Sequence, residues 1–402
     1  MDTPARRPVP VLFLLGALCA LGPLALDLYL PAAAALALEF GAERPVVAWS
    51  VVSYLLGMVF GQLLYGPFSD RYGRKPPLQV GLLIYTVAAL GCMLVDRADG
   101  FIALRGLQGL GACAGMVIAR AVVRDLSSGA AAARLFSQLM LVVSAAPLLA
   151  PSLGAFLLQY GGWRALFGVM AGFGWLCLLA VRCAMTESLP PERRLPASWR
   201  LAFRNYGLLM RDEQFLGYTI CNGLVQAGMY AYIAVSAPLF IEEYGLSPAQ
   251  YGVLFAVNSL GMIVAAQVNV QLIKHYALSN IVSNTLVFLL ALVLLGMLTL
   301  SDGTRLPLPV LLGGLFCFLS CIGLIAPNAA ALALAAHGAR AGTASALMGT
   351  LLFAIGAGCG IVVSLSDAGA DAALREAIVI VTIAAAALDC WMRWPGVTPP
   401  HA

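Results

Sequence analysis

The chain consists of long apolar runs separated by short polar turns. Twelve of these runs meet or approach the roughly 20 residues that a bilayer core requires. Continuous apolar runs are typical of membrane helices, whereas barrel strands alternate between apolar and polar positions. We therefore expect an all-α membrane protein with transmembrane helices over residues 9–38, 46–65, 78–95, 100–123, 135–160, 165–185, 215–242, 249–273, 281–300, 308–332, 344–366 and 375–394.

The longest polar stretch, residues 186–214, divides these spans into six and six. We expect an N-terminal bundle over 1–185, a linker over 186–214 and a C-terminal bundle over 215–402. The linker is too short for a core of its own, and its amphipathic part, Trp199 to Met210, predicts a short surface helix. Two halves of six spans are typical of a transporter in which one bundle rocks against the other.

Composition agrees with a membrane protein, since 61% of the 402 residues are hydrophobic and only 10% are charged. A typical soluble domain carries about 25% charged residues. The net charge of +4 comes without a long basic run, so nucleic-acid binding is not expected. The ten cysteines are scattered without a CxxC pair, which argues against a zinc site or a disulfide framework.

The distribution of positive charge predicts the orientation. With twelve spans, sixteen lysines and arginines lie on the side of both termini, five lie on the opposite side, and Arg105 and Arg120 lie inside the fourth span. This bias places both termini in the cytoplasm of a bacterial-type inner membrane. Arg6 and Arg7 precede an apolar run longer than a signal peptide, so we interpret that run as an uncleaved first span.

The turn between the second and third spans is the most distinctive stretch. Residues 61–76 break at Gly66-Pro67 and then place Asp70, Arg71, Arg74 and Lys75 within six residues. A compact basic turn between two apolar runs indicates a membrane hairpin with its turn in the cytoplasm. The corresponding turn of the second half, Gln271 to Tyr276, lacks the Gly-Pro and the aspartate, so the internal repeat is weak in sequence.

Asp27 is the clear exception among acidic residues that otherwise fall in loops or near span ends. An ionisable group inside a span is costly and usually faces a cavity, where a carboxyl can load and release a proton. The alternative is a carboxylate permanently paired with a neighbouring cation. Asp389 is a second acid, close enough to the end of the last span to reach the interface.

Arg105 is the obvious partner for Asp27 in sign. By helical rise it lies about 8 Å, and Asp27 about 16 Å, from the outer ends of their spans. We hypothesise that Arg105 favours the charged form of Asp27 in one conformation and not in the other. The alternative is an arginine fixed by hydrogen bonds to helix carbonyls. Gln108 follows among small residues that favour close helix packing, although it could also face a substrate.

Further polar and proline residues could contribute to transport. Pro147, Pro151 and Gly154 predict a bend in the fifth span that serves as a gate or as a static kink. Asn222, Gln226 and Tyr230 recur every fourth residue and share one face of the seventh span. Such a face suits an amphipathic organic substrate, and interhelical hydrogen bonding is the alternative role.

The sequence contains no motif that indicates catalysis or cofactor binding. It contains no phosphate-binding fingerprint, no metal-ligand constellation and no nucleophile triad. We therefore expect neither an enzyme nor a cofactor, with the energy coming from a proton gradient or from the substrate's own gradient.

The residues resemble a known family. Gly61 to Pro76 resembles the loop signature of the major facilitator superfamily, G-x-L-x-x-G-P-x-x-D-R-x-G-R-K/R-P, and Arg105 to Gly109 resembles the fourth-helix signature of its proton-coupled members. Pro147 to Gly154 is similar to the antiporter signature. Asp27 to Pro31 and Glu187 to Arg194 resemble the bicyclomycin-resistance (Bcr/CflA) drug-efflux subgroup.

The resemblance implies multidrug export by alternating access, driven by proton antiport, and hence antibiotic resistance. It also implies a cytoplasmic latch, whose candidate members are Gly61, Gly66, Asp70, Arg71, Gly73, Arg74 and Asp125. Candidate substrate contacts are Tyr29, Gln108, Asn222, Gln226 and Tyr230. The expected partners are a small-molecule substrate, protons and the lipid bilayer, with the protein a monomer.

Two other functions remain open at this stage. A symporter or uniporter with the same fold would carry a small metabolite, such as a nucleobase or an amino-acid derivative. A non-transporting receptor or scaffold would need no acid inside a span, so Asp27 and Arg105 argue against it.

Overall fold

The structure is a computed structural model that describes residues 8–41, 46–126, 129–194, 199–298, 306–366 and 369–393. Every regular element in these ranges is helical. The chain forms two compact units, Met1–Val46 with Ser53–Ala202 and Val47–Val52 with Phe203–Ala402. The all-helical prediction is therefore confirmed.

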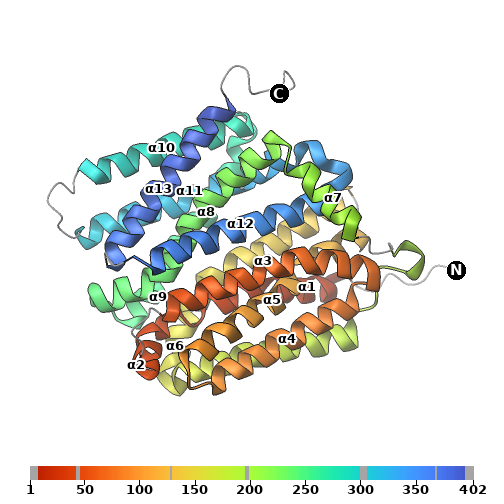
Figure 1. Cartoon of the computed structure of the whole chain (residues 1–402), viewed down its shortest axis with the longest axis horizontal. Helices are drawn as coiled ribbons and strands as arrows, with labels where there is room; N and C mark the ends of the chain where they lie inside the picture. The colour runs from red at the N-terminus through yellow and green to blue at the C-terminus, as the bar shows by residue number, and fades with distance from the viewer. Residues whose placement is uncertain are drawn as a thin grey trace. The chain divides into compact units, whose positions relative to one another are not determined.

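The first unit contains the spans expected from the N-terminal half (Figure 1). Its elements are α1 (Pro8–Asp27), η1 (Leu30–Ala32), α2 (Ala33–Phe40), α3 (Val46–Tyr72), α4 (Lys75–Leu94), α5 (Ala98–Leu126), α6 (Gly129–Ala184) and η2 (Pro191–Arg193). Within α6, Gly162 has a φ of 62°. Because this left-handed backbone breaks a helix, α6 has two legs, which correspond to the fifth and sixth predicted spans.

The first predicted span is not one continuous helix. The expectation of an unbroken helix over 9–38 is wrong, since α1 ends at Asp27 and is followed by η1 and then α2. Pro31 lacks the amide hydrogen that would bond to the carbonyl oxygen of Asp27, four residues earlier, which accounts for the interruption. As a result, Asp27 stands at the end of a helix instead of in its middle.

The second unit contains the spans of the C-terminal half. Its elements are α8 (Glu213–Ala237), the π-helical turn η3 (Pro238–Glu243), α9 (Pro248–Leu272), α10 (Leu278–Leu298), α11 (Leu308–Leu334), η4 (Ala335–Arg340), α12 (Ala341–Ser364) and α13 (Ala370–Met392). Between the halves, α7 (Trp199–Leu209) forms the short helix that the amphipathic pattern predicts.

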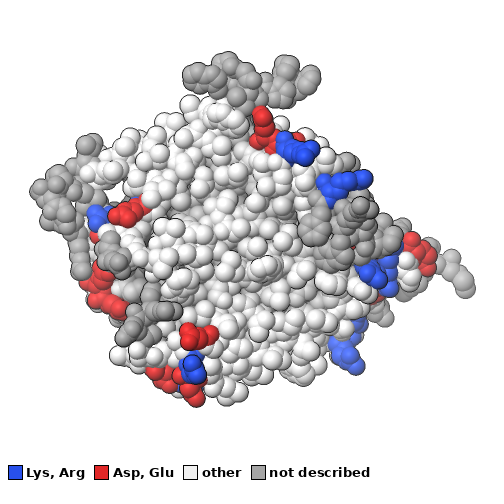
Figure 2. Space-filling model, viewed as in Figure 1, with Lys and Arg blue, Asp and Glu red and all other residues white. Residues whose placement is uncertain are grey.

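The helices fit a membrane. Ten segments of the described chain are long and apolar enough to span a bilayer, and one of them, Leu149–Ala184, covers the end of the first leg of α6 and the whole second leg. The first leg of α6 and α13, which carries Asp371, Arg375, Glu376 and Asp389, complete the twelve predicted spans. On the face shown in Figure 2, charged residues lie near the helix ends and the surface between them is free of charge.

Helix α5 is the central element of the first unit, because it packs against α1 and α4 and also against α3. Glycines allow the close approach to α3. A Cβ atom at Gly109 would lie 2.2 Å from the carbonyl oxygen of Tyr54, and one at Gly57 would lie 2.0 Å from that of Gly106. Close packing of this kind holds Arg105, on α5, next to α1 and α3.

Candidate functional site

Asp27 is buried in the first unit, with 2% of its surface exposed. It is the last residue of α1, and Leu28 and Tyr29 separate it from η1. Its Oδ1 atom is enclosed and has no hydrogen-bond partner among the described residues. A buried carboxyl oxygen without a partner is uncommon, because burying a polar atom without a hydrogen bond is costly.

Arg105 is fully buried on α5 and is held from several sides. Its Nη2 atom donates to the carbonyl oxygen of Ala25 at 2.8 Å, and Nη1 donates to the side chain of Gln108. Its guanidinium carbon lies 4.4 Å from the ring centre of Tyr29 and 4.7 Å from that of Tyr54. The Ala25 carbonyl belongs to the last turn of α1, where carbonyl groups lack helical partners and favour a cation.

Arg105 therefore binds the backbone of the helix turn that carries Asp27, but it does not form an ion pair with that carboxylate within the described part of the chain. The bond from Arg105 to the Ala25 carbonyl is of the kind expected from the alternative interpretation, in which hydrogen bonds to helix carbonyls hold the arginine. It also holds the guanidinium against the last turn of α1, which carries the Asp27 carboxyl.

Two of the candidate substrate contacts support Arg105 instead of presenting a free surface. Gln108 is fully buried, accepts from Arg105 and has its amide nitrogen 3.5 Å from the sulfur of Met170. Tyr29 is fully buried, with its ring against the guanidinium and near the ring of Phe167. Both side chains hold the arginine in a fixed orientation.

Gly154 is where α6 comes closest to the Asp27 turn. A Cβ atom at Gly154 would lie 1.9 Å from the carbonyl oxygen of Leu28, the residue after Asp27. The helix continues through Pro147 and Pro151, and Pro151 is buried, whereas the side chain of Pro147 lies outside the described residues. The contact ties α6 to the break in α1.

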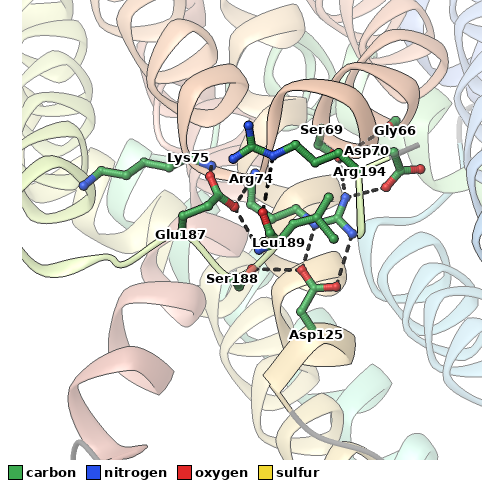
Figure 3. A network of polar contacts seen from close by, with 10 residues as sticks. All are labelled: Gly66, Ser69, Asp70, Arg74, Lys75, Asp125, Glu187, Ser188, Leu189 and Arg194. Carbon is green, nitrogen blue, oxygen red and sulfur yellow. Dashed lines mark hydrogen bonds and ion pairs between the residues drawn. The ribbon is translucent and has the colours of Figure 1, made fainter. Parts of the chain in front are cut away.

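A second polar site surrounds Arg74, at the turn between α3 and α4 (Figure 3). Its Nε atom lies 2.8 Å from Oδ2 of Asp125, at the end of α5, and its Nη1 atom lies 2.5 Å from Oδ1 of Asp70. Nη1 also donates to Ser69 Oγ at 2.9 Å. Burial alone lowers the pKa of Arg74, but hydrogen bonds to Asp125 and Asp70 raise it above its usual value.

Glu187, just after α6, binds the backbone of the same turn. Its carboxylate accepts from the amide of Arg74 at 2.7 Å, from that of Lys75 at 3.1 Å and from that of Leu189 at 3.0 Å. Gly73 makes room for it, with a φ of 91° and an ideal Cβ position only 2.6 Å from Glu187 Oε2. A carboxylate at the beginning of α4 also complements the helix dipole.

Three further hydrogen bonds connect the end of α6 and the chain after it to this site. Lys75 Nζ donates to the carbonyl oxygens of Arg182 and Met185, both at 2.9 Å, and Ser188 Oγ donates to Asp125 at 2.8 Å. We call the set Asp70, Arg74, Asp125 and Glu187 the Arg74 cluster. All four residues belong to the first unit.

The remaining latch candidates have different surroundings. Arg71 is exposed and lies over the ring of Tyr72, 5.0 Å from its centre, so its contact is with an aromatic ring and not with the cluster's acids. A Cβ atom at Gly61 would lie 2.5 Å from that of Cys113, which makes Gly61 a packing residue between α3 and α5. Gly66 has open space where a Cβ would stand.

The candidates on α8 form a polar face in the second unit. Asn222 is buried and accepts a 2.9 Å hydrogen bond from Gln226, one turn later. Tyr230 is buried and packs against Gly356 on α12, with its ring near that of Phe353. Asp389 lies on α13, accepts from Ser283 on α10 and pairs with Arg393 at 3.4 Å, so it takes part in a polar contact between helices.

Sequence reasoning missed two supporting groups. Tyr54 lies against Arg105 and donates to the carbonyl oxygen of Gly22 at 3.0 Å, but an aromatic residue in an apolar run gives no signal of that role. Glu187 was noted only as part of a motif. The available signal was the position of Glu187 just after the sixth predicted span, together with Gly73 in another turn on the same predicted side of the membrane.

Comparisons with known proteins agree with this architecture. The profile of the Major Facilitator Superfamily matches residues 12–361. The chain is 33% identical over 356 residues to the "Uncharacterized MFS-type transporter YdgK" of Bacillus subtilis, covering 87% of each chain. It is 31% identical over 345 residues to the "Bicyclomycin resistance protein homolog" of Haemophilus influenzae, covering 85% of this chain and 86% of that relative.

A solved structure shows the same fold. The xylose transporter XylE from E. coli, in a partially occluded inward-open conformation, superimposes with a TM-score of 0.72 at 13% identity, covering 96% of this chain and 98% of that one. The profile matches most of the chain, and the helical architecture and the signature residues around Arg74 agree with it. This chain therefore belongs to the Major Facilitator Superfamily of membrane transporters.

Proposed function

We propose that this transporter exports small organic compounds in exchange for protons, with Asp27 as the group that alternately carries a proton and releases it. The observation that carries the proposal is the state of the Asp27 carboxyl, which is 2% exposed and has an enclosed oxygen without a partner. An unpaired buried carboxylate is costly, and uptake of a proton removes that cost.

Arg105 would set the balance between the two forms of Asp27. Its guanidinium binds the turn of α1 that carries the carboxyl, through the carbonyl oxygen of Ala25, and it also binds Gln108. An arginine already satisfied by other acceptors does not lock the acid permanently, in contrast to a direct ion pair. A small movement of α1 relative to α5 would therefore change the interaction and couple protonation to conformation.

The Arg74 cluster would lie on the cytoplasmic side, as the excess of lysine and arginine on the side of both termini predicts. Its ion pairs join α3, α4 and α5, and the hydrogen bonds of Glu187 add the chain after α6, all within one unit. We propose that the cluster keeps these helix ends together so that the N-terminal bundle moves as one body. A rigid bundle is what alternating access by rocking requires.

The relative from Haemophilus influenzae is named for bicyclomycin resistance, which supports an organic antibiotic as the class of substrate. The direct test is uptake of labelled bicyclomycin into proteoliposomes with imposed pH gradients. An exporter that exchanges drug for protons accumulates bicyclomycin when the lumen is acidic, and the variant Asp27→Asn loses this accumulation while it still exchanges the drug down its gradient.

Two results would contradict the proposal. Accumulation driven by an acidic exterior would indicate a symporter, and uptake that ignores the pH gradient would indicate a uniporter. Accumulation into an acidic lumen that is unchanged in Asp27→Asn would show that the coupling acid is elsewhere. The variant Asp389→Asn serves as the matched control, since it removes a buried carboxylate from the second unit.

A further inference from the structure

Arg120 is a second intramembrane cation, and neither the Asp27 site nor the Arg74 cluster includes it. It lies inside the candidate span Ala98–Val123 on α5. Its helix neighbours Ile118, Ala119 and Ala121 are all buried, whereas Arg120 itself is partly exposed. This part of α5 is therefore packed against other parts of the protein, and Arg120 does not lie on a lipid-facing helix surface.

Arg120 has no partner among the described residues. Its Nε atom is enclosed without a hydrogen bond, and its guanidinium forms no ion pair with any described acid. Arg105 on the same helix is held by Ala25 and Gln108, and Arg74 is held by two carboxylates. A charge within a span usually has such a partner, because leaving it alone is expensive.

Among the described residues, the side chains on the two turns of α5 before Arg120 are neutral. Cys113 lies two turns before Arg120 on the same face of α5, and a Cβ atom at Gly115 would lie 2.4 Å from the carbonyl oxygen of Leu18, the residue before Cys19 on α1. Met116, one turn earlier, touches the amide nitrogen of Gln62 on α3 at 4.0 Å through its sulfur. Gln62 is 2% exposed, and a thioether is a weak acceptor for its amide. Gln62 therefore lies against the helix turn before Arg120, and its amide finds only this weak acceptor within the described part of the chain.

The nearest acid along α5 is already occupied. Asp125 follows Arg120 by five residues and binds Arg74 and Ser188. Arg105 precedes Arg120 by fifteen residues, or about 22 Å of helix, and roughly 60° around the axis. The two arginines therefore lie on similar sides of α5, at very different depths.

We propose that Arg120 recognises an acidic group on the transported compound, most simply a carboxylate, with Gln62 as an additional donor. This proposal rests on the proposed transport function and adds a substrate class to it, organic acids with an apolar body, beside uncharged compounds such as bicyclomycin. A guanidinium suits the role because its planar donors bind a carboxylate in a bidentate manner, and the missing ion-pair partner is then supplied by the substrate.

The test measures binding, without any gradient, to the full-length protein in nanodiscs of zwitterionic lipid. Three carboxylic acids are compared with their uncharged amides, namely benzoate with benzamide, 2-naphthoate with 2-naphthamide, and N-acetylphenylalanine with its amide. Calorimetry should show that at least one acid binds about tenfold more tightly than its amide, which corresponds to about 1.4 kcal/mol.

Variants assign this preference to Arg120. The change Arg120→Gln should bring the acid-to-amide ratio to about one and leave the affinity for the amide unchanged, which also shows that the variant is folded. Arg120→Lys should keep part of the preference. Arg182→Gln removes an exposed arginine side chain at the end of α6, whose backbone carbonyl accepts from Lys75, and it should leave the ratio unchanged.

Three results would overturn the proposal. In the first, no acid binds the native protein more tightly than its amide does. In the second, Arg120→Gln still binds the acid more tightly than the amide. In the third, the native protein loses its preference for the acid when phosphatidylglycerol is added to the nanodiscs. The last result would assign Arg120 to a lipid phosphate. Asp27→Asn should retain the preference, so a failure of proton coupling and a failure of acid recognition are distinguishable.

Discussion

Replacing Glu187 by alanine tests whether the chain after α6 stabilises the Arg74 cluster. The change removes a carboxylate that accepts from three backbone amides, at 2.7, 3.1 and 3.0 Å. A hydrogen bond to a charged group contributes about 1.5–3 kcal/mol when buried. Because Glu187 is partly exposed, we take about 1 kcal/mol for each bond, or about 3 kcal/mol in total.

This loss should be visible in thermal unfolding of the purified protein, followed by tryptophan fluorescence. For a domain of this size, about 3 kcal/mol corresponds to a fall of roughly 6–12 °C in the unfolding midpoint. Glu187→Gln retains an acceptor oxygen and should lose about half as much. Glu192→Ala is the control, because Glu192 is an exposed acid in η2, five residues along the same segment.

The reasoning would be refuted if Glu187→Ala and Glu192→Ala had the same unfolding midpoint. Such a result would mean that the turn between α3 and α4 is stable without the carboxylate, and that Gly73 and Lys75 alone hold the segment in place. Unfolding at a lower temperature with unchanged drug transport would instead restrict Glu187 to a purely structural role.

Two other predictions concern the same unit. Gly154→Ala places a Cβ atom 1.9 Å from the carbonyl oxygen of Leu28, so it should force α1 and α6 apart. The variant should lose about 1–3 kcal/mol of stability and its pH-driven transport. Gly172→Ala is the control, because its Cβ meets nothing within 4 Å, and it should change neither stability nor transport. The raised pKa of Arg74 means that its contribution to stability is complete below its unfolded pKa and is lost only at very high pH. The difference in unfolding midpoint between the native protein and Arg74→Gln should therefore stay constant between about pH 6 and about pH 9, and a fall across that range would contradict the assignment.

The span pattern was predictable because lipid leaves few ways to satisfy a backbone, so apolar length alone gives the number and type of the elements. The interruption after Asp27 was less evident. Pro31 was visible in the sequence, but the apolar run continues through it, and hydropathy does not distinguish a helix from two helices joined by a short turn.

The candidate site was only partly predictable, for a different reason. Opposite charge predicted that Arg105 pairs with Asp27. In the structure, Arg105 instead binds the carbonyl oxygen of Ala25 and the side chain of Gln108, and it lies over two tyrosine rings. Carbonyl and aromatic partners leave no mark in a sequence, because every residue has a carbonyl and most spans have aromatic residues. Contacts of Glu187 with backbone amides 112 and 113 residues away are hidden for the same reason.

The most direct test of the central claim is proton release on drug binding, measured with a pH indicator in weakly buffered solution and without a membrane gradient. If Asp27 carries the exchanged proton, adding saturating bicyclomycin to the native protein should release protons, and Asp27→Asn should bind the drug without releasing any. Equal proton release from the native protein and from Asp27→Asn, or drug binding to the native protein without release at any pH, would contradict the account.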